Sequence, residues 1–289
     1  MGRLRTLGLI ALASGLIATA GCGGGGSTDR VSGLTPDEIL RQSHAAADAL
    51  TAFTLTADAT VQANVAPGAL PKLVTQALVG SVAVTGAGPV NVGSASLSFD
   101  AKLTGLPAIQ GNVTKVGGAL YVGVLGTDYK VALPAKQVES VVPAELAGGL
   151  LAWATAPTEV GRETIDGTKT VHLAATVDLD RALGAISGAV AGIGGGTVSG
   201  ATLRRSATQL HAAITERKLD LWIGIDDLIP RRVTARLRFD GRVDALPQVR
   251  SGSLDLDVRL SKIGEAVDIT APATTKVLDL ARLRSLAGG

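Results

Sequence analysis

Alternation of apolar and polar residues constrains the fold of this 289-residue chain more than any other feature of its sequence. From Phe53 to Gln62 every second residue is apolar and each residue between is polar. A strand places successive side chains on opposite faces, so a period of two predicts strands with one apolar and one polar face. We expect further strands in the runs 79–85, 94–104, 111–116, 119–124, 159–165, 169–177, 218–225, 231–243, 253–261 and 266–270.

The helical signals fall between groups of strands and do not alternate with them. Thr35, Pro36 and Glu38 form the cap, first helical residue and capping-box partner of a helix that we expect to reach about Leu50. Other helices are expected within 134–153, 178–190, 201–216 and 274–286. Strands in runs with helices grouped apart predict an α+β fold with a large antiparallel sheet.

Two of the late strands carry opposite charges on their outward faces. A hairpin centred near Leu246 would set Arg236 opposite Asp257 and Arg238 opposite Asp255. We therefore expect this charged stripe to be partly self-neutralised.

The first two dozen residues have the pattern of an export signal. Arg3 and Arg5 precede a short apolar run, and small residues lead to Cys22, the only cysteine. We expect a lipoprotein signal peptide at 1–21, lipid attachment at Cys22, and a glycine-rich tether at 22–34. Two alternatives are cleavage after Ala20, which would release a soluble protein with a free thiol, and a segment that stays uncleaved as a weak anchor.

Composition and motifs argue against several classes of function. A net charge of +2 gives no electrostatic case for nucleic acid, and a single cysteine excludes an intramolecular disulfide. His44, His172 and His211 have no acidic or histidine partner at metal-ligand spacing, and no nucleophile elbow or phosphate loop is present. We predict no enzyme, no cofactor and no metal. The chain has 46% hydrophobic but only 2% aromatic residues, which indicates either an internal apolar cavity or codon bias in a GC-rich genome.

Four segments, with the region around Cys22, resemble one group of exported proteins. They are Val116–Tyr121, Val160–Thr170, Leu221–Gly224 and Leu260–Pro272. In order and spacing they are similar to the LppX/LprG (LppX_LprAFG) family of mycobacterial lipoproteins. The resemblance implies a LolA/LolB-like half β-barrel, which is a large bent antiparallel sheet with helices covering its concave face, over residues 35–272. It leaves 273–289 as a C-terminal helical tail and 184–216 as a longer segment than the family has.

The same resemblance implies a lipid carrier facing the periplasm and held at the cell membrane by its lipid anchor. Its ligand would be an acylated lipid or glycolipid, and an envelope transporter would be a further partner. Matching of strands places the wall of the lipid cavity at Leu55, Ala57, Ala95, Leu97, Phe99, Leu221, Ile223, Val233, Ala235 and Leu237. A register slip of one residue would move all ten to the other face. The alternative function is a structural or interaction lipoprotein with a filled core.

Overall fold

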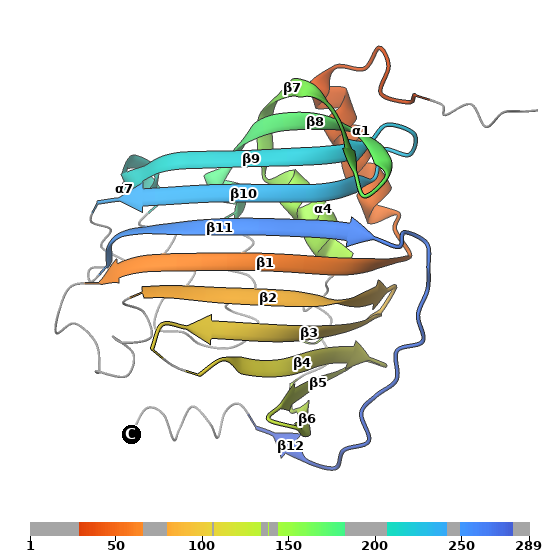
Figure 1. The fold of residues 1–289 in the computed structure, drawn as a ribbon, viewed down its shortest axis with the longest axis vertical. Coiled ribbons are helices and arrows are strands. Elements are labelled where there is room, and N and C mark those ends of the chain that lie inside the picture. The colour runs from red at the N-terminus through yellow and green to blue at the C-terminus, as the bar shows by residue number, and fades with distance from the viewer. Residues whose placement is uncertain are drawn as a thin grey trace, which may run out of the picture.

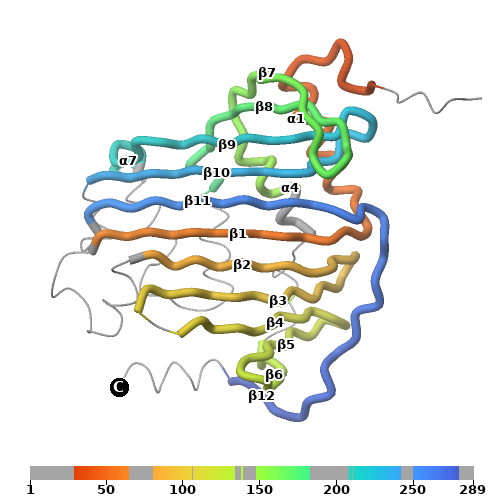
Figure 2. The backbone as a smooth tube through the Cα atoms, in the orientation of Figure 1, coloured from red at the N-terminus to blue at the C-terminus, as the bar shows by residue number. Residues whose placement is uncertain are grey.

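The structure is a computed structural model and describes residues 29–65, 80–105, 107–133, 138, 144–182, 207–241 and 249–279. Most of the described chain lies in one sheet (Figures 1 and 2). The helices are α1 (Pro36–Asp48), α4 (Ala144–Ala152) and α7 (Ala207–Ala213). The strands are β1 (Ala52–Val65), β2 (Gly80–Asn91), β3 (Ser94–Leu103), β4 (Ile109–Val116), β5 (Ala119–Val124), β6 (Thr127–Val131), β7 (Ala154–Ile165), β8 (Thr168–Val177), β9 (Ile214–Gly224), β10 (Pro230–Asp240), β11 (Val249–Ser261) and β12 (Val277–Leu278).

The twelve strands form one open, bent sheet in the order β12-β6-β5-β4-β3-β2-β1-β11-β10-β9-β8-β7. Neighbouring strands are antiparallel except β12 and β6, which are parallel. β1 therefore lies at the centre, although it is the first strand in the chain. The predicted α+β half-barrel with a large antiparallel sheet is confirmed, with one short parallel pair added.

Both edges of the sheet are short or irregular. At one edge, β7 breaks its register with β8 between Thr155 and Thr158 and again between Glu159 and Gly161. Ala156, inside the first break, has a positive φ of 51°. At the other edge, β12 contributes two residues.

Helix α1 begins as the sequence predicts. Thr35 accepts a hydrogen bond from the backbone N–H of Glu38 and the Glu38 side chain accepts from the backbone of Thr35, so the capping box is complete. Ile39 and Ala47 point into the core, where they are 1% and 2% exposed. The helix therefore packs one apolar side onto the sheet and leaves its charged side outside.

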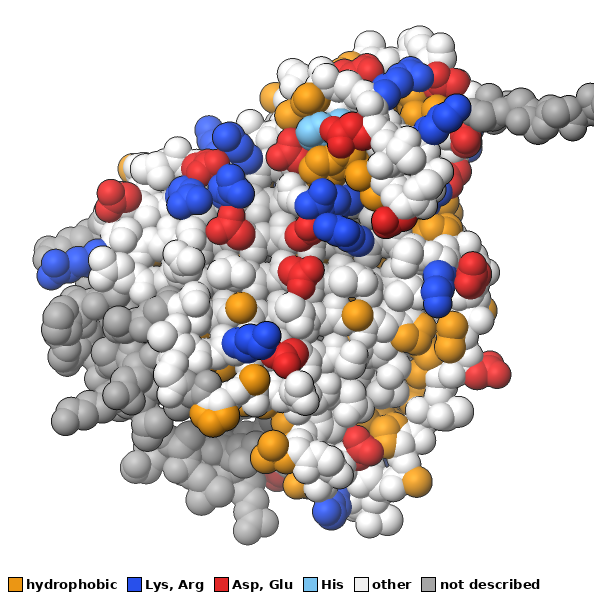
Figure 3. All heavy atoms as spheres, viewed as in Figure 1, with side chains coloured by type: hydrophobic (Ala, Val, Ile, Leu, Met, Phe, Trp, Pro, Cys, Tyr) orange, Lys and Arg blue, Asp and Glu red, His pale blue; other side chains and the backbone are white. Residues whose placement is uncertain are grey.

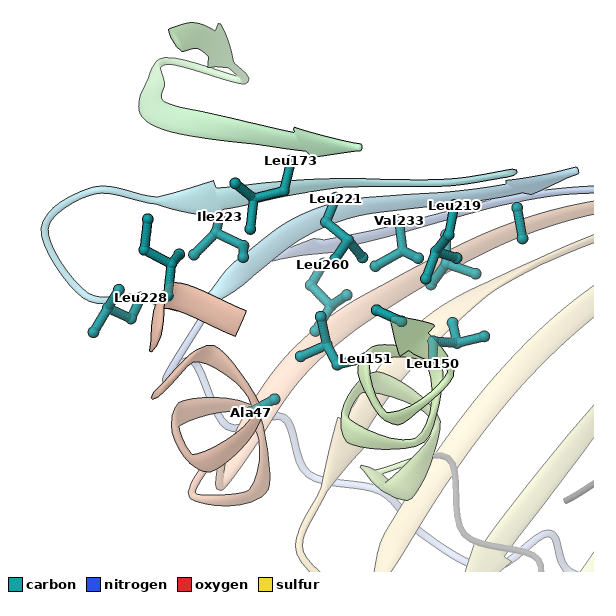
Figure 4. Close-up of a cluster of buried hydrophobic side chains, with 14 of the residues drawn as sticks. Ala47, Leu150, Leu151, Leu173, Leu219, Leu221, Ile223, Leu228, Val233 and Leu260 are labelled. Carbon is teal, nitrogen blue, oxygen red and sulfur yellow. The ribbon is translucent and has the colours of Figure 1, made fainter. Parts of the chain in front are cut away.

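The packed core lies between the concave face of the sheet and helices α1 and α4 (Figure 4). Leu150 and Leu151 of α4 lie below a layer of strand side chains in this view. The fully buried members of that layer are Val171, Leu173, Leu219, Leu221, Ile223 and Val233, each 0% exposed.

Three predicted elements were wrong in part. Ile214–Glu216 belong to β9 and not to the helix expected to end there, because Glu216 lies opposite Arg238 on β10. Residues 266–270 form no strand; instead the Asn91 amide donates a 2.6 Å hydrogen bond to the Val267 carbonyl. Val277–Leu278 form strand β12 where a terminal helix was expected, because the Lys130 N–H donates to the carbonyl of Lys276, 2.9 Å away.

The predicted register of the β10–β11 hairpin was also wrong, by two residues. Arg236 lies opposite Asp255, and Arg238 lies opposite Ser253. A shift of two keeps every side chain on its face, so the predicted faces are correct while the predicted pairs are not. Arg238 pairs instead with Glu216 at 2.8 Å.

Several predicted features lie outside the described residues. These are the signal peptide, Cys22 and most of its tether, most of 184–216, and the chain beyond 279. Strand β6 was not predicted, because its five residues follow a two-residue turn and share no long alternating run. Within the described residues, no helix is both long enough and apolar enough to span a bilayer.

Candidate functional site

The concave face of the sheet presents rows of apolar residues that run across the strands. In one row Leu221 lies beside Val233, Val233 beside Val258, and Val258 beside Ala57. The row continues through Gly86 to Phe99, whose ring lies over Gly111 on β4. On β11, β1, β2 and β3 the described side chains of this face are Ala, Val, Leu and Phe, with glycines between them. On these four strands the face therefore offers no side-chain hydrogen-bonding group to a polar ligand.

All ten residues predicted to line a lipid site lie on this face, so the predicted alternation has the right phase. Six of them are buried: Leu55, Ala95, Leu221, Ile223, Val233 and Ala235. Four are half-buried: Ala57, Leu97, Phe99 and Leu237. The first group belongs to the packed core between the sheet and helices α1 and α4, and Ala57, Leu97 and Leu237 of the second group pack against that core. Their role as a cavity wall stays a prediction.

Exposure of the face rises along the central strands β1 and β2. We call the end where β1 begins and β11 finishes the near end, and the opposite end the far end. Along β1, Leu55 is 3% exposed and Val61 is 44% exposed. Along β2, Val90 at the near end is 1% exposed and Val84 is 36% exposed. The near half is therefore packed, whereas the far half has apolar side chains in contact with solvent.

Exposed and half-buried apolar side chains at the far end of β1 to β4 form one cluster, which we call the open patch. Val61 lies opposite Val82, which lies opposite Leu103 on β3. Val84 lies one row away, and across Ala101 from it is Ile109 at the start of β4, 41% exposed. The open patch thus comprises Val61, Val82, Val84, Leu103 and Ile109. Sequence reasoning named none of these as site residues, although the alternation in 79–85 already placed Val82 and Val84 on one face.

The face also holds one buried charge. Lys115 on β4 lies opposite Ala95 and Leu120 at the near end and is 6% exposed. Its position marks where the apolar surface of the central strands gives way to the small cluster of Leu120, Val131 and Val138.

The convex face has the opposite character (Figure 3). Its charged side chains gather over β8 to β11, and small polar side chains cover much of the rest. Arg232 makes two hydrogen bonds to Asp257, at 3.0 and 2.7 Å, and Arg236 pairs with Asp255 at 2.7 Å. Burial acts to raise the pKa of Asp257, but hydrogen bonds from Arg232 and Arg259 outweigh it and hold that pKa below its ordinary value. The expected self-neutralisation of this stripe is confirmed, with different partners.

His172 belongs to this charged face and points outward, as predicted. Its ring stacks on Trp222 with centroids 4.4 Å apart, and Arg232 lies over the other ring face of Trp222 at 4.9 Å. The imidazole lies 2.9 Å from Asp220 and 3.1 Å from Glu163. Among the described residues no group of three or more His, Cys, Asp or Glu side chains has an arrangement that could hold a metal ion.

The convex face also holds a depression of about 680 Å³ at the far end of the sheet. Its lining includes the polar residues Asn64, Arg238, Asp240 and Ser251 together with Ala63 and Phe239. The two faces therefore differ in what they can bind: the concave face suits an apolar chain, and the convex face does not.

No protein-family model matches the chain, and no curated protein matches it. Among solved structures, the chain is similar to LprF from Mycobacterium bovis, with 20% identity over 83% of this chain and 99% of that one and a TM-score of 0.45. It is also similar to the lipoprotein LppX from Mycobacterium tuberculosis, with 16% identity over 82% of this chain and 100% of that one and a TM-score of 0.38. Both are mycobacterial lipoproteins of the group that the sequence motifs resemble.

Proposed function

We propose that this protein is a membrane-anchored lipoprotein that binds the acyl chains of lipids or glycolipids on its concave face and carries them across the cell envelope. The observation that carries this proposal is the open patch. Val61, Val84 and Ile109 are 36% to 44% exposed, although they continue a face that is buried at its near end. Continuous apolar surface in contact with water marks a site for an apolar partner.

The physical chemistry of the face selects an acyl chain as that partner. Burial of apolar surface contributes about 25 cal/mol per Å², or about 0.8 kcal/mol for each methylene. An acyl chain needs no hydrogen bonds, and the central strands offer none on this face. Binding would therefore depend on chain length and tolerate varied headgroups, as a carrier of acylated lipids requires.

The anchor completes the proposal. Lipid on Cys22 would hold the domain at the cell membrane, facing the periplasm, and several acyl chains hold far better than one. From Cys22 to Asp29 is a span of seven residues, of which Gly23 to Gly26 are glycines, so the domain would move on a short flexible tether. An envelope transporter that supplies or receives cargo is part of the same proposal.

Two neighbouring residues of β2 give a matched test. Val84 faces the concave side and Thr85 the convex side, and both are exposed. The mature domain without Cys22 contains no cysteine, so Val84→Cys and Thr85→Cys each carry a single thiol for the polarity-sensitive dye acrylodan. Added oleate should shift the emission of the dye at position 84 to the blue and leave the dye at position 85 unchanged.

Mass spectrometry of organic extracts supplies the second measurement. The purified domain should release co-purifying acylated lipid. A clean extract, together with no oleate response at either dye position, would overturn the proposal. In that case the packed cluster beneath α1 and α4 would support the alternative, a scaffold or accessory lipoprotein with a filled core.

A further inference from the structure

We propose that the acyl-binding face opens at the far end of the sheet, opposite the end where the membrane tether leaves, so that cargo is exchanged on the side away from the anchoring membrane. This inference rests on the proposed function and adds to it the direction from which the face is reached. It commits to one occupant, an acyl chain presented by a second membrane on that side.

The first step is the position of the tether. Asp29, the first described residue, forms an ion pair with Arg162 on β7. The next residue, Arg30, donates its backbone N–H to the carbonyl of Ile225 at 2.8 Å. Ile225 directly follows the last residue of β9, and β9 finishes at the near end beside the start of β10. The chain leading back to Cys22 therefore leaves the described fold at the near end.

The second step is that the near end of the concave face is closed. Phe53 and Leu55, at the start of β1, are 2% and 3% exposed. Leu260, opposite Leu55 on β11, is 3% exposed, and Leu151 of α4 beside this layer is 1% exposed (Figure 4). An acyl chain cannot slide in at this end without displacing a packed core, which has almost no free volume.

The third step is that exposure rises toward the far end on several strands at once. On β1 the rise is to Val61, on β2 to Val84, and on β4 the first residue is Ile109. On β11 the burial also loosens, from Val258 at 4% to half-buried Leu256 and Leu254. On these four strands the far end is therefore the accessible end of the face, whereas on β8 the face stays buried to Val177, which is 1% exposed.

The length of the sheet and the reach of the tether together determine how far the open patch can lie from the membrane. The 14 residues of β1 span about 45 Å at about 3.3 Å per residue. The seven residues from Cys22 to Asp29 reach at most about 25 Å when extended. With the strands upright on the membrane, the open patch would point away from the anchoring bilayer. The anchored domain can then meet an acceptor across the envelope without releasing its anchor.

Single-cysteine blocking at the two ends tests the direction of access. In the domain without Cys22, Val61→Cys places a thiol in the open patch, and Val92→Cys places one at the near end, in the β2–β3 turn, where Val92 is 71% exposed. Each is modified with a thiol reagent that adds a permanent positive charge. The rate of uptake of cis-parinaric acid, an intrinsically fluorescent fatty acid, is then measured by stopped flow.

Charge at position 61 should slow uptake at least tenfold, and charge at position 92 should change it less than twofold. Slowing at position 92, or no slowing at position 61, would overturn the far-end opening. If the unmodified domain takes up no fatty acid, it is the proposed function that fails. Circular dichroism before and after modification confirms that each variant is folded.

A second measurement uses the lipid-anchored full chain in phosphatidylglycerol vesicles. Transfer of cis-parinaric acid from a separate vesicle population should be at least tenfold slower for Val61→Glu than for Val92→Glu. Equal transfer by both variants would overturn exchange on the distal side.

Discussion

The contrast between the two ends of the concave face predicts that one substitution, valine to alanine, has very different costs at Val233 and Val61. Val233 is 0% exposed and lies between Leu221 and Val258, whereas Val61 is 44% exposed. Removing two buried methyl groups costs about 1.6 kcal/mol in transfer free energy. The cavity left behind adds to this where packing cannot relax, so Val233→Ala should lower the free energy of unfolding by about 2–3 kcal/mol.

At Val61 just over half of the side chain is buried, and water fills the space that the methyl groups leave. Val61→Ala should therefore cost less than about 1 kcal/mol. Urea unfolding followed by circular dichroism measures both values, and unchanged slopes with denaturant show that the same surface unfolds. Equal losses for the two variants would mean that the far half of the face is packed as tightly as the near half. The open patch would then not exist in solution, and the proposed function would lose its main support.

Three further outcomes follow from the structure. Val84→Glu should weaken oleate binding by two orders of magnitude or more, since an acyl chain there would desolvate the carboxylate at a cost of several kcal/mol, while Thr85→Glu should bind as the parent does in the same titration. Thr35→Ala removes the cap of α1 and should lower the free energy of unfolding by about 1 kcal/mol, measured by urea titration. The lowered pKa of Asp257 contributes stability above its ordinary value of 3.8, which is lost as the pH falls through the lower folded value; Asp257→Asn should therefore reduce the acid dependence of thermal unfolding below pH 4, and an unchanged dependence would contradict this.

The faces of the strands could be predicted from the sequence because alternation has a period of two and its phase is local. Every predicted site residue, from Leu55 on β1 to Leu237 on β10, therefore lies on the expected side. The pairing of β10 with β11 could not be predicted, because shifts of two residues leave apolar side chains opposite apolar ones. Arg236 has an aspartate within reach in either register, so charge does not decide between them.

The open patch was missed for a different reason. Val61 and Leu55 are alike in pattern, since both occupy apolar positions of one strand. What separates them is which helices cover the sheet and how far along it they reach, and this depends on contacts between segments distant in sequence. Helix α4, nearly 80 residues after β1, contributes Leu150 and Leu151 to the same core as Leu55. No local pattern carries that information.

The irregular border formed by β7 has a consequence for the behaviour of the protein in crowded surroundings. A sheet that exposes apolar residues would be at risk of aggregation, because an unpaired edge strand can form hydrogen bonds with a strand of another molecule. The register breaks near Thr158 and Gly161 and the left-handed Ala156 spoil the regular spacing that such pairing needs. At the opposite border, the two-residue strand β12 offers too short a ladder to recruit a neighbour. The molecule can thus expose an apolar binding surface and still resist edge-to-edge association with other copies of itself.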